Sequence, residues 1–365
     1  MSSPWPNFAL RSLCAINALL PGGVRHAEAE RILVYRMGNL GDIVVALPAF
    51  HALRRHFPGA KITLITSPTK RGAPSAQEVL AKDDTFDDMI VYYEDESSKS
   101  DFLRAMRQRL SAARFDLAVL LPGDRATAMS LTKQVALLAT AGIRHIVGAR
   151  VISAGDYRRG QVPRTMDSVA SLCGDGIEDF PWIRHDADDE AHVATLLPET
   201  TDGPLIGMQC GAKRPANRWM ADRFVALGKR LVEEHKARLI LTGSAGESAL
   251  LSEIAVEISA GCVNLAGKTT IPELAVLAAR CDAFISNDTG TMHVAACMGT
   301  PVVAIFSGRD DEHRWYPYGD QHTVLRHSPD CSPCLEDTCP LYDDPICLSA
   351  HEVDDVFAAV TKVLG

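Results

Sequence analysis

The stretch formed by residues 281–308, CDAFISNDTGTMHVAACMGTPVVAIFSG, constrains the fold of this chain more than any other part of the sequence. An apolar run at 283–286 ends at a polar turn, and small and apolar residues at helical spacing begin at Met292. A Gly-Thr-Pro sequence ends that helix, and residues 302–306 form a second apolar run, typical of a buried strand. The stretch therefore predicts a strand, a turn, a helix and a strand, as in doubly wound α/β sheets.

The turn inside this stretch carries residues suited to a nucleotide. It lies between the carboxyl end of a strand and the start of a helix, where free N–H groups and the helix dipole favour a phosphate. Asp288 can accept hydrogen bonds from a ribose or a base, Gly290 allows a phosphate to approach the backbone, and His293 can donate to a phosphate oxygen. A lone D-x-G turn is more often an ordinary turn with its aspartate as a helix cap, so a second motif is needed.

A second turn of this kind lies near the N-terminus. Residues 31–36 (RILVYR) form the first clear strand, Gly38 and Gly41 bracket a tight loop, and Asp42 opens a helix. Residues 61–67 form the next strand, so the unit is a right-handed βαβ crossover. The loop matches neither the dinucleotide fingerprint nor a G-K-[ST] phosphate loop. An aspartate there usually complements the helix dipole, but its place at the end of a strand also suits a general base.

The alternation of strands and helices runs twice along the 365 residues. Two consecutive α/β units predict two Rossmann-like domains that face each other across a cleft. The predicted parts are an N-terminal helical extension at 1–30, a Rossmann-like domain at 31–175, a Gly-, Pro- and Asp-rich linker at 176–204, a second Rossmann-like domain at 205–350 and a C-terminal helix at 351–365.

Charge and composition limit the partners and the compartment. Residues 1–175 carry 22 Lys and Arg against 17 Asp and Glu, whereas residues 176–365 carry 15 against 29. The first half is therefore expected to meet an anionic partner, with ordinary surface charge as the alternative. The sequence has neither an apolar run long enough to span a membrane nor a signal-peptide pattern, so we expect a cytoplasmic protein.

Four cysteines lie close together in a Pro- and Asp-rich loop at 328–350, which we call the Cys-rich loop. They are Cys331, Cys334, Cys339 and Cys347. Four soft ligands in a reduced compartment predict a structural zinc or iron site, which would order a segment with little apolar content. The spacing is not that of a standard zinc ribbon, and free thiols or a labile disulfide are the alternatives.

Together the two motifs resemble glycosyltransferase family 9, the heptosyltransferases of lipopolysaccharide core assembly. The resemblance rests on ILVYRMGNLGDIVVALPAFHALRRHFPGAKITLIT and DAFISNDTGTMHVAACMGTPVVAIFSG, and it extends over about residues 31–363. It implies the glycosyltransferase B fold, with ADP-heptose bound by the C-terminal domain and an anionic glycolipid or glycan acceptor by the N-terminal one. It also implies inversion at the anomeric centre without a catalytic metal or other cofactor. We expect no nucleic-acid partner, and the acceptor suggests a peripheral contact with the inner membrane.

The resemblance suggests roles for individual residues. Asp42 matches the catalytic base of the family, and Arg36 falls where the family often has a lysine near the acceptor or the phosphates. Asn39, in the same loop, is assigned to this acceptor site with Arg36. The residues implied for the donor are Thr269 beside the adenine, together with Asp288, Thr289, Gly290 and His293.

One position departs from the pattern of the family. The family often has a lysine two residues before a tryptophan, and this chain has Asn217 before Trp219. We therefore expect Lys213 or Arg218 to provide the cation for the donor diphosphate.

The resulting hypothesis is an inverting glycosyltransferase. A carboxylate takes the proton of the acceptor hydroxyl, while a helix N-terminus, a histidine and a cation stabilise the leaving diphosphate. Two other interpretations stay open. A two-domain nucleotide-sugar epimerase would need a second acid or base in the cleft. A non-catalytic homologue that only binds the nucleotide sugar would have no need of Asp42, which the chain retains.

Overall fold

The computed structural model describes residues 28–365 except 69–70, 94, 96–99, 124–125, 152–153, 198–202 and 259–260, and also residues 9 and 12. The helical extension predicted at 1–30 therefore lies almost wholly outside the described residues. The chain divides into two compact units, Met1–Asp179 and Phe180–Gly365. The division falls inside the segment 176–204 that was predicted to be a linker.

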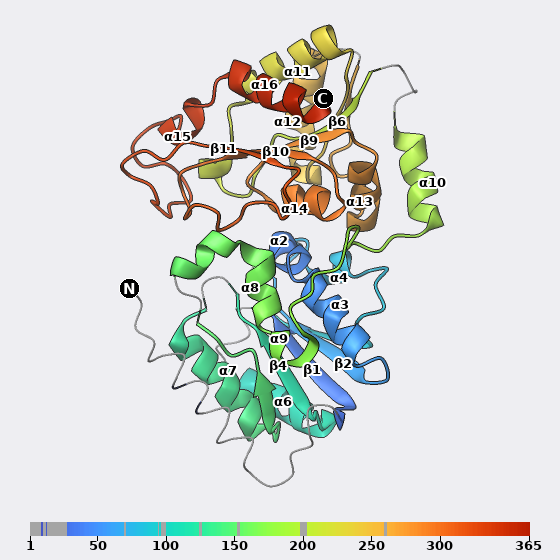
Figure 1. The fold of residues 1–365 in the computed structure, drawn as a ribbon, viewed down its shortest axis with the longest axis vertical. Helices are drawn as coiled ribbons and strands as arrows, with labels where there is room; N and C mark the ends of the chain where they lie inside the picture. The colour runs from blue at the N-terminus through green and yellow to red at the C-terminus, as the bar shows by residue number, and fades with distance from the viewer. Residues whose placement is uncertain are drawn as a thin grey trace. The chain divides into compact units, whose positions relative to one another are not determined.

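The first unit is built on a five-stranded parallel sheet with the order β3-β2-β1-β4-β5 (Figure 1). Its strands are β1 (Arg31–Arg36), β2 (Lys61–Thr66), β3 (Asp88–Val91), β4 (Leu117–Leu121) and β5 (His145–Val147). The central strand β1 pairs with β2 and β4, so that Val34 lies opposite Leu64 and Val119. The apolar runs of β1 and β4 are almost fully buried, as expected for parallel strands covered on both faces.

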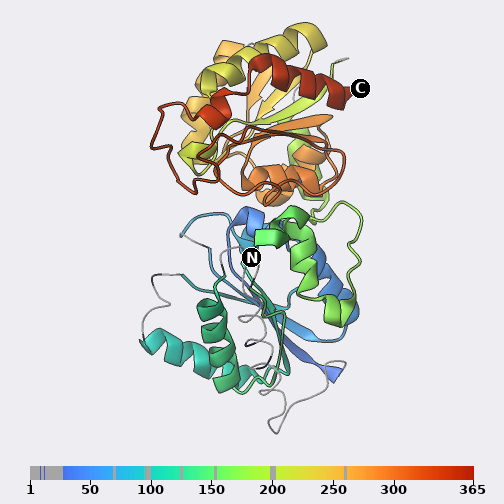
Figure 2. The ribbon, with the colours of Figure 1, turned by 60° about the vertical axis from the view of Figure 1, so that its left-hand side comes forward.

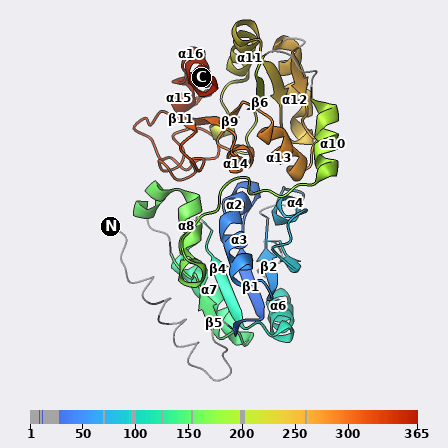
Figure 3. The same ribbon diagram turned by 45° about the vertical axis from the view of Figure 1, so that its right-hand side comes forward.

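Helices cover both faces of this first sheet. They are α2 (Leu40–Val44), α3 (Leu47–His56), α4 (Ala76–Val79), α6 (Ser100–Ala113), α7 (Ala128–Thr140), α8 (Gln161–Asp167) and α9 (Ala170–Cys173), with the 3-10 helix η2 (Ala154–Arg159). Leu33 and Tyr35 of β1 join the apolar cluster that also contains Met106 and Leu110 of α6 and Val135 of α7. Helix α3, which packs against α8 and α9, belongs to the other layer (Figure 3).

The second unit contains a six-stranded parallel sheet with the order β11-β10-β9-β6-β7-β8. Its strands are β6 (Leu205–Gln209), β7 (Arg238–Leu241), β8 (Cys262–Asn264), β9 (Ala283–Asn287), β10 (Val302–Phe306) and β11 (Thr323–Arg326). Its helices are α10 (Ala187–Leu196), α11 (Ala221–His235), α12 (Ser248–Ile258), α13 (Ile271–Ala279), α14 (Gly290–Cys297), α15 (Ile346–Ser349) and α16 (Val353–Leu364), with the 3-10 helices η3 (Pro215–Asn217) and η4 (Ala245–Glu247).

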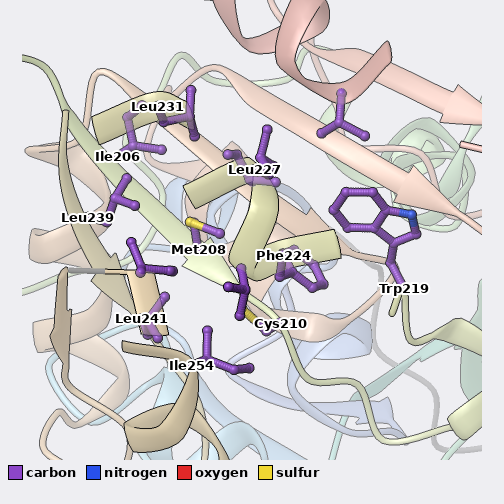
Figure 4. Close-up of a cluster of buried hydrophobic side chains, with 14 of the residues drawn as sticks. Ile206, Met208, Cys210, Trp219, Phe224, Leu227, Leu231, Leu239, Leu241 and Ile254 are labelled. Atoms are coloured by element: carbon purple, nitrogen blue, oxygen red, sulfur yellow. The ribbon is translucent and has the colours of Figure 1, made fainter. Parts of the chain in front are cut away.

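Two apolar clusters hold the layers of the second unit together. Met208 and Leu241 of the sheet pack with Phe224 and Leu227 of α11 and with Ile254 of α12 (Figure 4). Helix α16 lies beside α11 over the same face (Figure 2). The second cluster contains residues of α10, α13 and α14, and α10 packs against α13. The predicted linker thus ends in a helix that belongs to the second unit.

The strand orders indicate where each unit can bind a ligand. Counted from β6, the second sheet has the order 3-2-1-4-5-6 of nucleotide-binding Rossmann folds, and the first sheet has the order 3-2-1-4-5. Ligands bind doubly wound sheets at the carboxyl ends of the strands where the order reverses. This point lies between β1 and β4 in the first unit and between β6 and β9 in the second. The prediction of two Rossmann-like domains is confirmed.

Within the part of the chain that the structure describes, no helix combines the length and the apolar character needed to cross a lipid bilayer.

Candidate active site

The turn after β1 brings Arg36, Asn39 and Asp42 together at the switch point of the first sheet. Asn39 is the N-cap of α2, and its N–H donates to Oδ2 of Asp42 at 3.0 Å, so the two residues form a capping box. Gly38 has a φ of 139°, and a Cβ at this position would overlap the Asp42 side chain. The turn therefore requires glycine at this place, which explains the G-N-L-G-D sequence in part.

Arg36 is the buried centre of this turn. Its Nη2 donates to the Asp42 carbonyl oxygen at 2.7 Å and lies 3.8 Å from Oδ1 of the same residue. Its Nη1 donates to the carbonyl oxygen of Pro122 at 2.9 Å, just beyond β4. The guanidinium thus ties together the ends of β1 and β4. The Asp42 side chain stays 22% exposed, so a ligand can reach its carboxylate.

In the second unit, the turn between β9 and α14 holds Asp288, Thr289 and Gly290. Thr289 is the N-cap of α14, and its side chain makes no capping hydrogen bond. The first N–H groups of α14 therefore keep their capacity to bind an anion, which the helix dipole also favours. Buried Asn287 fixes the turn, because its side chain accepts from the Trp219 N–H at 3.0 Å and donates to the Cys210 carbonyl at 2.7 Å.

Asn217, at the position where the family often has lysine, lies directly against Asp288. Its Nδ2 donates to Oδ2 of Asp288 at 3.0 Å and to the Asp288 carbonyl oxygen at 3.2 Å. Its Oδ1 accepts a hydrogen bond from the hydroxyl of Ser307 at 2.8 Å. Asn217 is 3% exposed, so its amide links the ends of three neighbouring strands, β6, β9 and β10, inside the protein.

Burial changes the charge states at this turn. Burial raises the pKa of Asp288 to about 7, and Asp310 adds to the effect, whereas Arg214, Arg309 and Arg326 act in the opposite direction. Burial, aided by His322, lowers the pKa of His293 to about 4. His293 is therefore neutral at physiological pH and can donate one N–H, while Asp288 is divided between its two protonation states.

Three further residues were predicted for the donor site. Lys213 and Arg218 are exposed, and Nε of Arg218 donates to the carbonyl oxygen of Ala212 at 2.7 Å. Thr269 lies in the turn after β8, two strands from β6 in the sheet, and among the described residues no hydrogen bond joins it to Asp288 or His293. Lys213 and Arg218 thus belong to the segment that reaches Asp288 through Asn217, whereas Thr269 follows a more distant strand.

Two arginines make hydrogen bonds that hold the Cys-rich loop. Buried Arg309 donates to the carbonyl oxygens of Glu336 at 2.7 Å and Leu335 at 2.9 Å, and to the Asp337 carboxylate at 3.1 Å. Arg326 adds a bond to the Ser332 hydroxyl at 3.2 Å. The segment has little buried apolar surface, as expected, and these hydrogen bonds hold it to the second unit.

The four thiols of this loop are free, with Cys331 exposed and the other three half-buried. Burial raises the pKa of Cys347, and the neighbouring Cys334 and Cys339 contribute to the rise. In the chain as described, no group of three or more His, Cys, Asp or Glu side chains is arranged to hold a metal ion.

Comparison with known proteins identifies the family. The sequence profile of "Glycosyltransferase family 9 (heptosyltransferase)" matches residues 103–343, more than half of the chain. This protein belongs to that family. The profile begins after β3, so the match includes the turn at Asp288 but not the turn at Asp42.

Individual relatives agree with this assignment. Lipopolysaccharide heptosyltransferase 2 of Escherichia coli is 32% identical over 132 residues, which are 35% of this chain and only 38% of that protein. Lipopolysaccharide heptosyltransferase 1 of Pseudomonas aeruginosa is 24% identical over 85% of this chain and 87% of its own length. The solved structure of E. coli ADP-heptose lps heptosyltransferase II matches with a TM-score of 0.66 and 22% identity, over 92% of this chain and 98% of that one. This likeness concerns the fold, which is the predicted glycosyltransferase B fold.

Several residues of these turns were not predicted from the sequence. They are Asn287, Ser307 and Arg214. Each one makes a hydrogen bond with a residue more than 60 positions away in the chain, and the charge of Arg214 also lowers the pKa of Asp288. The only local signal was polar residues directly after the apolar strand runs, at Asn287 and Ser307.

Proposed function

We propose that this protein is an inverting glycosyltransferase. It transfers a heptose from an ADP-linked donor to an acceptor of the lipopolysaccharide core or a related glycan. One observation carries the proposal: the two motifs of the family resemblance lie at the switch points of two separate Rossmann-like sheets, where such folds bind ligands. Family membership and the name of the E. coli enzyme, an ADP-heptose heptosyltransferase, support the choice of sugar and nucleotide.

The donor half of the site is the turn from Asp288 to His293. The N–H groups at the start of α14 and the neutral imidazole of His293 donate hydrogen bonds to the diphosphate, and Gly290 lets it approach. Asp288 accepts from a hydroxyl of the ribose. Thr269 contacts the adenine, as the resemblance implies.

The acceptor half of the site is the turn from Arg36 to Asp42. The Asp42 carboxylate takes the proton from the acceptor hydroxyl as the hydroxyl oxygen bonds to the anomeric carbon. The bond from that carbon to the diphosphate breaks on the opposite face, and ADP leaves with the electron pair. Arg36 and Asn39 hold the loop and orient anionic groups of the acceptor. The step needs no metal or other cofactor.

The substitution Asp42→Asn tests this mechanism. The amide oxygen can still accept the hydrogen bond from the Asn39 N–H, so the capping box should persist and the melting temperature should change little. We expect kcat for heptosyl transfer to fall by about two to four orders of magnitude, because the base is lost. ADP affinity, measured by calorimetry, should stay within about twofold, since the donor turn belongs to the other sheet.

A matched control is Asp116→Asn, which alters another carboxylate of the first unit that accepts backbone N–H groups, those of Glu30 and Arg31. This control should keep the kcat of the wild type. Turnover of Asp42→Asn close to that of the wild type would show that Asp42 is not the base. The same assay separates the alternatives, because an epimerase would convert the free nucleotide sugar and a binding homologue would bind ADP without turnover.

We also propose a role for the Cys-rich loop and a location for the enzyme. One zinc or iron ion would bind Cys331, Cys334, Cys339 and Cys347, whose thiolates are suitable soft ligands, and it would have to draw these thiols together, since they are not grouped around a metal site in the described residues. It takes no part in the reaction, because four protein thiolates leave no open coordination position. The enzyme acts in the cytoplasm, in peripheral contact with the inner membrane that carries a lipid-linked acceptor.

A further inference from the structure

We propose that Arg214 provides the cation that contacts the donor diphosphate, and that Asp337 of the Cys-rich loop holds Arg214 in place. The inference rests on the proposed function and deepens it, because it assigns the charge that a lysine at position 217 would have carried. It replaces the expectation that Lys213 or Arg218 has this role.

A cation is needed near Asp288 because negative charge develops on the diphosphate as the glycosidic bond breaks. Asn217 cannot meet this need. Its amide is neutral, and both its nitrogen and its oxygen are engaged with Asp288 and Ser307. The half-ionised carboxyl group of Asp288 would itself repel the diphosphate, so a nearby positive charge has to compensate.

Arg214 has the position and the free donors for this role. It lies in the segment after β6, at the switch point, and its positive charge acts on Asp288 directly. Its Nε donates to the Asp337 carboxylate at 2.9 Å, while its two Nη atoms donate to no described residue. Those two atoms form the fork that binds a phosphate in bidentate fashion.

The other arginines that act on Asp288 are committed elsewhere. Arg309 uses its donors on Asp310 and on the backbone and carboxylate oxygens of residues 335–337. Arg326 donates to the carbonyl oxygens of Ser307 and Asp310 and to two serine hydroxyls. Both hold loops together inside the unit. Among these three arginines, Arg214 is thus the one whose Nη1 and Nη2 both make no hydrogen bond to a described residue.

Asp337 is fixed well enough to orient Arg214. An exposed ion pair by itself contributes little, and the Asp337 side chain is 75% exposed. However, Arg309 also donates to this carboxylate at 3.1 Å, and the carbonyl oxygen of Asp337 accepts from the Ala216 N–H at 3.0 Å. The Cys-rich loop is therefore attached to the segment 214–217 at two points, and the guanidinium of Arg214 is positioned before the nucleotide binds.

Calorimetry with ADP and AMP tests the assignment on the full-length protein. Arg214→Gln should weaken ADP binding by about tenfold or more, the usual effect of losing a hydrogen bond to a charged group, and should weaken AMP binding less. Arg214→Lys should recover part of the loss, because it restores the charge without the fork. Arg230→Gln is the matched control, because Arg230 lies on α11 of the same unit and, like Arg214, pairs with a carboxylate; this variant should keep the ADP affinity of the wild type.

Asp337→Asn tests the positioning role. It should weaken ADP binding less than Arg214→Gln and should have no further effect when combined with it, because both changes act through one guanidinium. Its effect should appear in the KM for the donor, with kcat changed far less than by Asp42→Asn. The melting temperature of each variant, taken beside the binding data, separates loss of contact from loss of folding.

The results that overturn the inference differ from those that overturn the proposed function. Unchanged ADP affinity in Arg214→Gln, or an equal loss in the control Arg230→Gln, excludes Arg214 as the diphosphate cation while leaving the proposed heptosyl transfer untouched. If Arg214→Gln does not fold, the other two variants decide. ADP binding by Arg214→Lys and by Asp337→Asn that is as tight as in the wild type then excludes Arg214 as the diphosphate cation. A wild-type protein that binds ADP without transferring heptose overturns the proposed function alone, and one that does not bind ADP overturns both.

Discussion

At the scale of single residues, burial brings the pH at which Asp288 changes its charge close to neutral. Its pKa of about 7 in the folded protein exceeds the ordinary value of 3.8, mainly because the carboxyl group is buried. The folded state therefore holds the proton more tightly than the unfolded chain. The stability that this group contributes falls as pH rises from 3.8 to about 7, and it changes little above that range.

The variant Asp288→Asn should reveal this dependence. Its amide does not ionise, and its oxygen can still accept from Nδ2 of Asn217. The melting temperature of the variant relative to wild type should therefore be higher at pH 8 than at pH 5, as measured by scanning calorimetry. A difference that stays the same at both pH values, or that shrinks at pH 8, would mean that Asp288 is ionised throughout.

The residues of the two turns differ in how far the sequence could predict them. Asp288 stands directly after one apolar strand run and Asp42 follows another by a short Gly-containing loop, so their placement near the carboxyl ends of strands follows from local pattern alone. The pairing of Arg214 with Asp337 joins positions 123 residues apart and depends on how the Cys-rich loop folds back. No periodicity in the sequence carries that information.

At the scale of elements, the strands that the sequence analysis located are those with mostly apolar, buried sequences. Strands β9 and β10 are buried at every position, and β1 and β2 at every position but the first. Strand β11 was not predicted, because it lies at the edge of the sheet, is half-buried throughout and mixes polar with apolar residues.

Helix α10 shows why a polar stretch is not always a linker. Its sequence, rich in Asp and Glu, was interpreted as part of the linker 176–204. In the structure, Asp186 caps the helix by accepting from the N–H groups of Asp188 and Asp189 at 3.1 Å, and the other acidic residues of the first turn complement the helix dipole. A single buried Val193 docks it on the second core.

For the Cys-rich loop, the prediction is that it binds one metal ion. Protein purified without chelator should contain about one equivalent of zinc plus iron by elemental analysis, and chelation should lower its melting temperature. Because Arg309 and Arg326 also hold this loop, removal of the ion should leave the second unit folded. Cys331→Ser should lose the metal, whereas Cys173→Ser, in the first unit, should retain it.

Less than about a tenth of an equivalent, together with four titratable thiols in the loop, would contradict the metal site. The cysteines would then be ordinary reduced thiols. The arginine contacts to Leu335, Glu336 and Asp337 would remain as the source of order in the loop.

At the scale of the whole molecule, each unit has its own sheet and its own apolar clusters. Hydrogen exchange with ADP alone should show where the nucleotide binds. We expect added protection at the backbone N–H groups of 211–218 and 288–296 in the second unit, with smaller changes at 37–45 in the first. The reason is that the proposed contacts with ADP all come from the loops of one sheet.

Adenosine serves as the control in that experiment. It lacks the diphosphate, so it should protect the start of α14 much less than ADP does. Stronger protection of 37–45 than of 288–296 by ADP would contradict the assignment of the donor to the second unit.

The two sheets share no strand, and each one carries a complete turn at its own switch point. Mutations that reshape the loops of the first sheet leave the packing behind the β9–α14 turn untouched. With the acceptor and donor roles proposed for the two units, descendants of such a gene could therefore acquire a new acceptor while inheriting the same activated sugar. A change in the product would then need only sequence change in one half of the gene, or an exchange of that half by recombination near the codons for Asp179 and Phe180.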